Sequence, residues 1–197
     1  MKIRHTNVEK DLEEIHQIWQ EIGWMDNSKE DKKGLKIFLN GGKGIGTEIN
    51  GRLEAFVNSV EGTLRYQKKD IPIHGLAGVT VSRIARKQGL ASKLTAIALE
   101  EAYQNGMAIS GLGMFDQGFY DKLGYGTGSY ENYFIFDPDK LNVNYKAKIP
   151  ERLTYKDWKK AHKSRLKRKK HHGYCTLHSE NITKGEKTDM YEYLNLF

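Results

Sequence analysis

One segment, residues 78–94 (GVTVSRIARKQGLASKL), constrains the fold more than any other part of the 197-residue chain. Its β-branched run Val79-Thr80-Val81 predicts a strand, and apolar residues at helical spacing from Leu90 onward predict a helix. Between them lies a basic turn that contains a glycine, residues 86–92 (RKQGLAS). A strand, a glycine-containing turn and a helix in this order are typical of α/β proteins that bind ligands at the start of the helix.

The turn between this strand and this helix is suited to binding a pyrophosphate. Unpaired backbone N–H groups and the positive end of the helix dipole meet there. Gly89 allows the backbone to come close to a phosphate, and Ala91 keeps the first helical turn uncrowded. Arg86 and Lys87 add positive charge. A solvated basic turn in front of a helix is the alternative interpretation.

Two motifs in order resemble those of the GCN5-related N-acetyltransferases (GNAT). The pattern Arg-x-x-Gly-x-Ala at residues 86–91 is similar to the acetyl-CoA pyrophosphate loop of that family, and residues 115–126 (FDQGFYDKLGYG) are similar to its F-Y-x-x-x-G-Y/F motif. The match covers residues 75–136 in order and spacing. Within the superfamily, the chain most resembles the N-terminal domain of the Eis-type (enhanced intracellular survival) acetyltransferases. Those proteins are about twice as long, so the chain resembles a truncated or shortened member.

The resemblance implies an α/β (α+β) GNAT fold. This fold is a mixed central sheet, flanked by helices, whose fourth and fifth strands part to admit the pantetheine arm of acetyl-CoA. The implied activity is that of an acyltransferase, an N-acetyltransferase that uses acetyl-CoA as cosubstrate. The acetyl group passes to a primary amine of a small molecule or peptide by direct attack of the amine on the thioester.

The resemblance also assigns roles to individual residues. The expected cofactor-binding residues are Val79, Thr80, Val81, Arg86, Lys87, Gln88, Gly89, Leu90, Ala91 and Ser92. The strand backbone would face the acetyl oxygen and the pantetheine amides. Tyr120 is the expected catalytic acid, because a phenol of pKa about 10 can protonate a thiolate whose conjugate acid has a pKa of about 8.5. A core tyrosine is the alternative interpretation.

The chain departs from the family pattern at two positions. Phe115 stands where Eis-type proteins often have a small hydroxyl residue, and Arg83 stands where the family commonly has proline. The first departure would reshape the acceptor pocket. The second should matter less.

The sequence does not assign the general base. Eis-type enzymes are thought to use a C-terminal carboxylate delivered by their last domain, which this chain lacks; the carboxylate of Phe197 is a formal candidate. Glu54, Glu61, His74 and Asp26 are further candidates, each expected to be a surface group. A second function therefore stays open, that of an acetyl-CoA-binding or nucleic-acid-binding protein with this fold and little catalytic activity.

The positive charge is concentrated in one segment. The chain carries a net charge of +7, and residues 151–172 hold ten Lys and Arg residues against Glu151 and Asp157, a local charge of +8 that leaves −1 for the rest. This segment is expected to form a basic helix over residues 151–170. A solvated face on a displaced second domain is the simpler interpretation, and binding to nucleic acid or an anionic membrane surface is the alternative.

Composition narrows the class of protein further. The mean hydropathy of −0.69 and the lack of a long apolar run predict no membrane span. The N-terminus has no apolar core after its basic residues, so no signal peptide is expected. A single cysteine, Cys175, excludes an internal disulfide. We therefore expect a cytoplasmic protein.

The periodicity of the remaining chain predicts the following elements. Strands are expected at residues 2–5, 44–49, 53–60, 71–81, 107–114 and 130–136, with a hairpin turn at Asn50-Gly51. Helices are expected at residues 8–24, around 35–39, at 89–104 and at 116–123.

Three regions follow from these elements. We expect an acetyltransferase domain at residues 1–138, a linker at 139–150 and the basic segment at 151–197. This last segment could be part of a second domain. We expect it to be dispensable for acetyl-CoA binding and to pack on the first domain or on another copy of the chain.

Two weaker signals favour no separate site. Residues 40–46 (NGGKGIG) resemble a phosphate loop but lack the Gly-Lys-Ser/Thr ending and precede a strand, so a flexible loop is expected. His171, His172, Cys175 and His178 are metal-ligand types at short spacing, but no second cysteine supports a zinc site, and no metal is expected.

Overall fold

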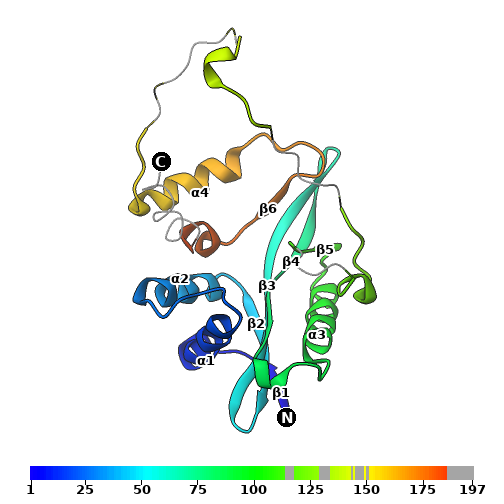
Figure 1. The fold of residues 1–197 in the computed structure, drawn as a ribbon. Coiled ribbons are helices and arrows are strands. Elements are labelled where there is room, and N and C mark those ends of the chain that lie inside the picture. The colour runs from blue at the N-terminus through cyan, green and yellow to red at the C-terminus, as the bar shows by residue number, and fades with distance from the viewer. Residues whose placement is uncertain (114–117, 129–133, 143, 145–148, 150, 186–197) are drawn as a thin grey trace.

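The computed structural model describes residues 1–113, 118–128, 134–142, 144, 149 and 151–185 (Figure 1). The strands are β1 (Lys2–His5), β2 (Lys43–Ile49), β3 (Arg52–Tyr66), β4 (Lys69–Val81), β5 (Ile109–Gly111) and β6 (Cys175–Leu177). The α-helices are α1 (Val8–Glu21), α2 (Lys29–Leu39), α3 (Leu90–Gln104) and α4 (Trp158–Lys167). Short 3-10 helices lie at Arg83–Ala85, Asp121–Leu123, Pro138–Lys140 and Tyr155–Asp157.

The strands form one mixed sheet in the order β1-β2-β3-β4-β5. Neighbours along this path are antiparallel except β4 and β5, which run parallel. Helices α1 and α2 cover one face of the sheet and α3 covers the other (Figure 1). The expected mixed α/β architecture is therefore confirmed.

The β2–β3 hairpin turns where the sequence predicts. Asn50 and Gly51 both adopt positive φ values, 52° and 81°. A two-residue turn with positive φ at both positions matches the twist of the flanking strands, and Asn-Gly tolerates it best.

Two hydrophobic clusters lie on the two faces of the sheet. Ala55 and Val57 of β3 join the cluster that packs against α3, which includes Leu94. Phe56 of the same strand joins the cluster that includes Ile15 of α1 and Leu35 of α2. This alternation is the period of two expected of a strand that is covered on both faces.

Helix α1 ends three residues earlier than its hydrophobic pattern predicts. Gly23 has φ of 80°, its N–H donates to Gln20 O at 3.0 Å, and the N–H of Trp24 donates to Trp19 O at 2.9 Å. These two bonds form a Schellman motif, which ends a helix at a left-handed glycine. Trp24 therefore leaves the helix and lies in the α1–α2 connection.

The second half of β3 pairs with a strand from the C-terminal segment. β2 pairs with β3 as far as Ser59, and β6 pairs with it from Gly62 to Leu64. Both are antiparallel to β3, so β6 continues the line of β2 along one edge of β3 (Figure 1). Gly62 permits this close approach, because a Cβ there would lie 2.5 Å from Thr176 O.

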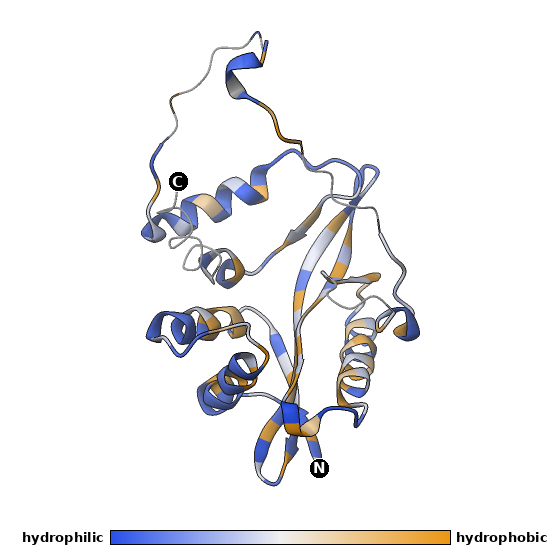
Figure 2. Ribbon diagram, in the orientation of Figure 1, coloured by the Kyte–Doolittle hydropathy of each residue, from blue (hydrophilic) through white to orange (hydrophobic). Residues whose placement is uncertain are grey.

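The rest of the segment packs behind β6. His162 of α4 is 6% exposed, and its Nδ1 lies 2.8 Å from Thr183 Oγ1. Asn181 Nδ2 donates to Asn40 O at the end of α2 at 2.9 Å. Most residues of α4 are hydrophilic (Figure 2), and its lysines Lys159, Lys160, Lys163 and Lys167 are exposed.

Several predicted elements differ in extent. The strand expected at residues 107–114 is observed at Ile109–Gly111, and of the helix expected at 116–123 the 3-10 turn Asp121–Leu123 is observed. Residues 134–136 form no strand and are exposed, while residues 129–133 lie outside the described part. The basic helix occupies Trp158–Lys167 of the expected range. In the described part of the chain, no helix is both long and apolar enough to cross a membrane.

Candidate functional site

The two parallel strands at the centre of the candidate site pair over a short distance and then part. The β4–β5 ladder consists of Ile73–Ile109, His74–Ser110 and Gly75–Gly111. β4 itself continues to Val81. Beyond Gly75, the edge of β4 that faced β5 is therefore open to a ligand, which can bond to its backbone as a strand would.

A β-bulge shapes the open part of β4. The pairing with β3 passes from Asn58–Ala77 to Phe56–Thr80, so Gly78 and Val79 both lie opposite Val57. Gly78 has φ of 60°, a left-handed conformation that glycine adopts at little cost. The bulge turns the backbone of β4 outward at the place where β5 has ended.

A cleft of about 260 Å³ occupies the opening between the two strands. It is lined by Trp24, Leu76, Ala77, Gly78, Val79, Ala91, Leu112, Gly113, Phe119 and Tyr120. These residues come from both sides of the parted strands, from the first turn of α3 and from the α1–α2 connection. The lining is mostly apolar, with a phenol hydroxyl and strand backbone as its polar groups.

The basic turn lies at the start of α3, beside this cleft. Gly89 is the N-cap of α3, with φ of 72°, and no side chain caps the first turn. A Cβ on Gly89 would meet no atom within 4 Å. Arg86 and Lys87 are exposed, and Lys87 also has a positive φ, 62°. The first-turn N–H groups thus face an open approach flanked by cations, which fits a pyrophosphate.

Aromatic rings hold Tyr120 at the cleft wall. The ring of Phe119 meets it edge-on with a centroid distance of 4.9 Å, and the ring of Tyr125 does so at 5.8 Å. The N–H groups of Leu123 and Tyr125 donate to Tyr120 O at 2.9 and 3.2 Å. The two ring contacts and the two backbone hydrogen bonds together restrict the direction in which the phenol of Tyr120 can point.

The structure brings some of the predicted site residues together and separates others. Val79, Ala91 and Tyr120 line the same cleft. Thr80 and Leu90 are buried, at 4% and 2% exposed, so only their backbone can meet a ligand. Six predicted residues are not in the cleft lining. They lie at the end of β4, in the turn before α3 and in the first turn of α3: Val81, Arg86, Lys87, Gln88, Gly89 and Ser92.

Sequence reasoning missed the part of the cleft that folding brings from elsewhere. The expected helix at residues 8–24 includes Trp24, although Gly23 before it is a signal for a helix end. The expected strand at residues 71–81 includes Gly78 as an ordinary strand position. An isolated glycine in a strand pattern is a signal for a bulge, so this position was recognisable.

None of the candidate bases that the structure describes lines the cleft. His74 is 2% exposed and Glu54 9% exposed, so the expectation that they are surface groups is wrong. Glu61 is exposed and pairs with Lys43, and Asp26 is exposed near Trp24. Among the described residues that line the cleft, none is a carboxylate or histidine. Phe197 and Phe115 lie outside the described residues.

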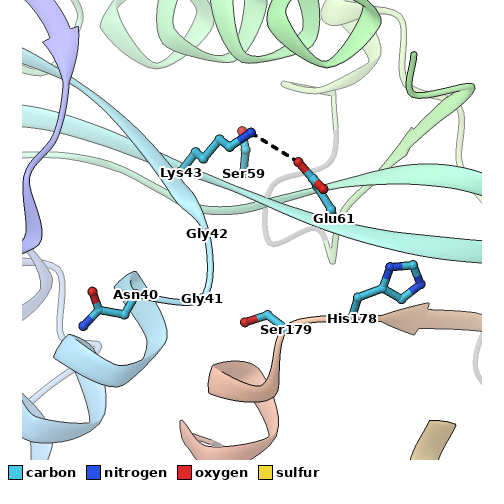
Figure 3. Close-up of a pocket in the computed structure, with 8 residues that line it drawn as sticks. All are labelled: Asn40, Gly41, Gly42, Lys43, Ser59, Glu61, His178 and Ser179. Atoms are coloured by element: carbon cyan, nitrogen blue, oxygen red, sulfur yellow. Dashed lines mark hydrogen bonds and ion pairs between the residues drawn. The ribbon is translucent and has the colours of Figure 1, made fainter. Parts of the chain in front are cut away.

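A second, more open pocket of about 350 Å³ lies where β6 ends and β2 begins (Figure 3). Lys43 Nζ and Glu61 cross it with a separation of 3.3 Å, and Ser59, His178 and Ser179 also line it. The glycine run that resembles a phosphate loop forms one wall and leads into β2. Within the described residues, no group of three or more His, Cys, Asp or Glu side chains is placed to hold a metal ion.

Comparison with known families decides the assignment. Residues 2–128 match the acetyltransferase (GNAT) domain model. The chain belongs to the GNAT family. Members of this family transfer acetyl groups from acetyl-CoA to amines. In this GNAT chain, the parted strands and the glycine turn lie where the resemblance predicts the cofactor site, and the bulge at Gly78 was not expected from the sequence. The search of curated proteins returns no match.

Solved structures agree on the GNAT fold. A probable N-acyltransferase from Enterococcus faecalis V583 has 18% identity and a TM-score of 0.58, covering 63% of this chain and 31% of that one. Eis1 from Mycobacterium abscessus has 16% identity and a TM-score of 0.53, with coverage of 64% and 30%. A predicted acetyltransferase from Clostridium acetobutylicum, solved with acetyl-CoA, has 14% identity and a TM-score of 0.54, with coverage of 72% and 99%. The match thus spans about a third of the first two proteins.

Proposed function

We propose that this GNAT chain is an acetyl-CoA-dependent N-acetyltransferase that acts on a primary amine. The observation that carries the proposal is the cleft between β4 and β5. There, the bulged backbone at Val79, the first turn of α3 at Ala91 and the phenol of Tyr120 line one cavity. The strand backbone would bind the thioester, the first turn of α3 would bind the cofactor phosphates, and the phenol would protonate the leaving thiolate.

The chain's own groups would act as follows. The open edge of β4 beyond Gly75 would donate N–H bonds to the pantetheine amides and to the thioester oxygen, stabilising the charge that develops there. The neutral amine nitrogen would form a bond to the acetyl carbon, the carbon–sulfur bond would break, and Tyr120 would give its proton to the leaving thiolate. The nitrogen would lose its extra proton to solvent water, and the Tyr120 phenolate would regain a proton from water. The turn at Gly89, with Arg86 and Lys87, would bind the pyrophosphate.

The amine acceptor would enter on the side of the α1–α2 connection. Trp24 comes from that connection, lines the cleft and is 39% exposed. Its indole can pack against the apolar part of an acceptor or against a cation. We place the acceptor among small-molecule or peptide amines.

We further propose that residues 1–138 correspond to the N-terminal domain of an Eis-type protein. The partial coverage of Eis1 from M. abscessus supports this proposal, as does the position of the GNAT match at residues 2–128. Residues 139–150 would then be a linker and residues 151–197 a separate segment that docks through β6.

A second candidate function is acetyl-CoA binding without turnover. The absence of a carboxylate or histidine among the described cleft residues favours it, because the amine must lose a proton during the reaction. The two functions differ in what the chain does once the cofactor is bound.

The test combines calorimetry with an amine panel. The wild-type chain should bind acetyl-CoA and release free thiol with at least one polyamine, lysine or aminoglycoside acceptor. Gly89→Glu, which places a side chain and a negative charge in the open turn, should abolish binding. Tyr120→Phe should keep binding and lower kcat by about 10²-fold.

Three results separate the alternatives. Binding without turnover on any amine favours the second function. Unchanged acetyl-CoA affinity in Gly89→Glu contradicts the cofactor site. An unchanged kcat in Tyr120→Phe removes the acid role from Tyr120.

A further inference from the structure

A chain of side-chain hydrogen bonds crosses three neighbouring strands where β4 and β5 still pair, before they part at the cleft. Ser59 Oγ of β3 lies 2.9 Å from His74 Nε2 of β4. His74 Nδ1 lies 2.9 Å from Ser110 Oγ of β5, and Ser110 Oγ lies 2.7 Å from the hydroxyl of Tyr125. Each distance is that of a well-formed hydrogen bond.

His74 is the central member of this chain and is 2% exposed. Burial lowers its pKa, and the opposing charge of Glu61 does not cancel this effect, so burial favours the neutral imidazole. A neutral imidazole has one donor and one acceptor nitrogen. In either tautomer, each group can donate to the next along the chain, from Tyr125 to Ser59 in one tautomer and from Ser59 to Tyr125 in the other. Hydrogen bonds aligned in this way strengthen one another.

The two ends of the chain differ. Ser59 is part-buried and opens into the pocket between β2 and β6 (Figure 3). Tyr125 is at the other end, and it touches Tyr120 twice: by its ring, at a centroid distance of 5.8 Å and an angle of 78°, and by its N–H, which donates to Tyr120 O. A fixed Tyr125 hydroxyl thus fixes one wall of the site in which Tyr120 lies.

We propose that His74 is a positioning residue for Tyr120. Through Ser110, its Nδ1 fixes the hydroxyl of Tyr125, and the ring of Tyr125 in turn holds the phenol of Tyr120 against the cleft. The proposal rests on the proposed function, in which Tyr120 protonates the leaving thiolate. The sequence suggested His74 only as a candidate base, and its bonds to two serines give it a different role.

Two substitutions of His74 separate positioning from a general loss of packing. The amide of asparagine lies the same number of bonds from Cβ as Nδ1, so His74→Asn can still reach Ser110. The amide of glutamine corresponds to Nε2, so His74→Gln can still reach Ser59. Each variant removes the imidazole and breaks one hydrogen bond, so the two are matched for loss of structure.

The proposal predicts different kinetics for the two variants. His74→Asn should keep kcat within about threefold of wild type, whereas His74→Gln should lower kcat by about tenfold or more. This loss is part of the rate enhancement that a well-placed acid provides. The Kd for acetyl-CoA should stay within about twofold in both, because the lost interaction acts on the chemical step. Equal losses of kcat in the two variants would overturn the proposal.

A second pair of variants keeps the test decisive if His74→Gln does not fold. Tyr125→Phe keeps the ring but removes the hydroxyl that Ser110 holds, and should lower kcat as His74→Gln does. Ser59→Ala removes the far end of the chain and should leave kcat unchanged. Wild-type kcat in Tyr125→Phe would contradict the role of the chain.

A readout without turnover separates this proposal from the proposed function. In protein labelled with 3-fluorotyrosine, the ¹⁹F resonance of Tyr120, assigned by its loss in Tyr120→Phe, reports the environment of the ring. It should be the same in wild type and His74→Asn and shifted or split in His74→Gln and Tyr125→Phe. If the wild type acetylates no amine, the proposed function fails while this comparison still decides the role of His74; an unchanged resonance in all variants would refute that role.

Discussion

Replacing Gly78 with alanine should disturb both the stability of the chain and its cleft. Gly78 has φ of 60°, and a Cβ on it would lie 3.1 Å from Trp19 Cζ2 and 3.4 Å from Phe56 Cε1. The added methyl group is therefore strained by its backbone conformation and crowded by the indole of Trp19. Because Gly78 forms the bulge that lines the cleft, relief of this strain would move the backbone that faces the ligand.

The magnitude follows from these two terms. An alanine in the left-handed region costs about 1–2 kcal/mol. The indole of Trp19 cannot retreat freely, because it packs against the rings of Trp24 at 5.2 Å and Phe38 at 5.7 Å. Crowding adds about 1 kcal/mol, so the free energy of unfolding should fall by about 2–3 kcal/mol. Each kcal/mol of this loss should lower Tm by about 2–4 °C.

Gly106→Ala is a matched control. Gly106 has φ of 78°, and a Cβ there would meet no atom within 4 Å. This variant carries the conformational cost without the crowding and lies away from the cleft. It should lose about 1–2 kcal/mol and keep its acetyl-CoA affinity, whereas Gly78→Ala should bind acetyl-CoA about tenfold more weakly.

The assays are thermal unfolding and calorimetry with acetyl-CoA. Equal stability losses in the two variants would show that the contact with Trp19 costs nothing. Unchanged acetyl-CoA affinity in Gly78→Ala would refute the reasoning that the bulge forms the ligand-binding edge of β4.

Three further predictions concern the framework of the fold. Gly62→Ala, whose Cβ would lie 2.5 Å from Thr176 O, should cost about 1–3 kcal/mol and make β6 more accessible to limited proteolysis. Burial raises the pKa of Asp11, but the hydrogen bonds from Arg4 and from the N–H of Asn7, together with the charges of Arg4 and Lys10, outweigh burial and lower the pKa. These interactions should therefore contribute stability above about pH 4 that is lost as the pH falls further, and acid unfolding of Asp11→Asn should lack this component. Leu94→Ala, at a fully buried position, should lower the free energy of unfolding by about 2–5 kcal/mol in urea denaturation.

Each of these substitutions has a control or a refuting result. Gly126→Ala meets no atom within 4 Å and should leave the proteolysis of β6 unchanged. Ile84→Ala, at a position that is 79% exposed, should change stability by less than about 0.5 kcal/mol. An acid-unfolding midpoint that is identical in wild type and Asp11→Asn would contradict the role of the Arg4 pair.

Local signals in the sequence predict the parts of the fold that depend on local geometry. Asn50-Gly51 specifies its turn because both residues tolerate positive φ, and Gly89 specifies the start of α3 for the same reason. The alternation at residues 55–57 of β3 follows from burial on both faces. These features need no knowledge of distant residues.

The parts that sequence reasoning missed depend on contacts between distant residues. β6 is three residues long and pairs with β3 more than a hundred positions away, so no local pattern identifies its partner. Trp24 reaches the cleft because Gly23 ends α1, and the bonds of His74 join three strands. Tyr120 was recognised from a motif, whereas the residues that hold it could be recognised only from the fold.

A structure of the chain bound to acetyl-CoA tests the central claim most directly. We expect the cofactor to lie between β4 and β5, with its thioester carbonyl against the backbone near Val79, its sulfur within hydrogen-bond reach of Tyr120 and its pyrophosphate at Gly89. A cofactor bound elsewhere, such as in the pocket between Lys43 and His178, would contradict the account. A cofactor in the cleft with Tyr120 turned away from the sulfur would contradict the role of the phenol.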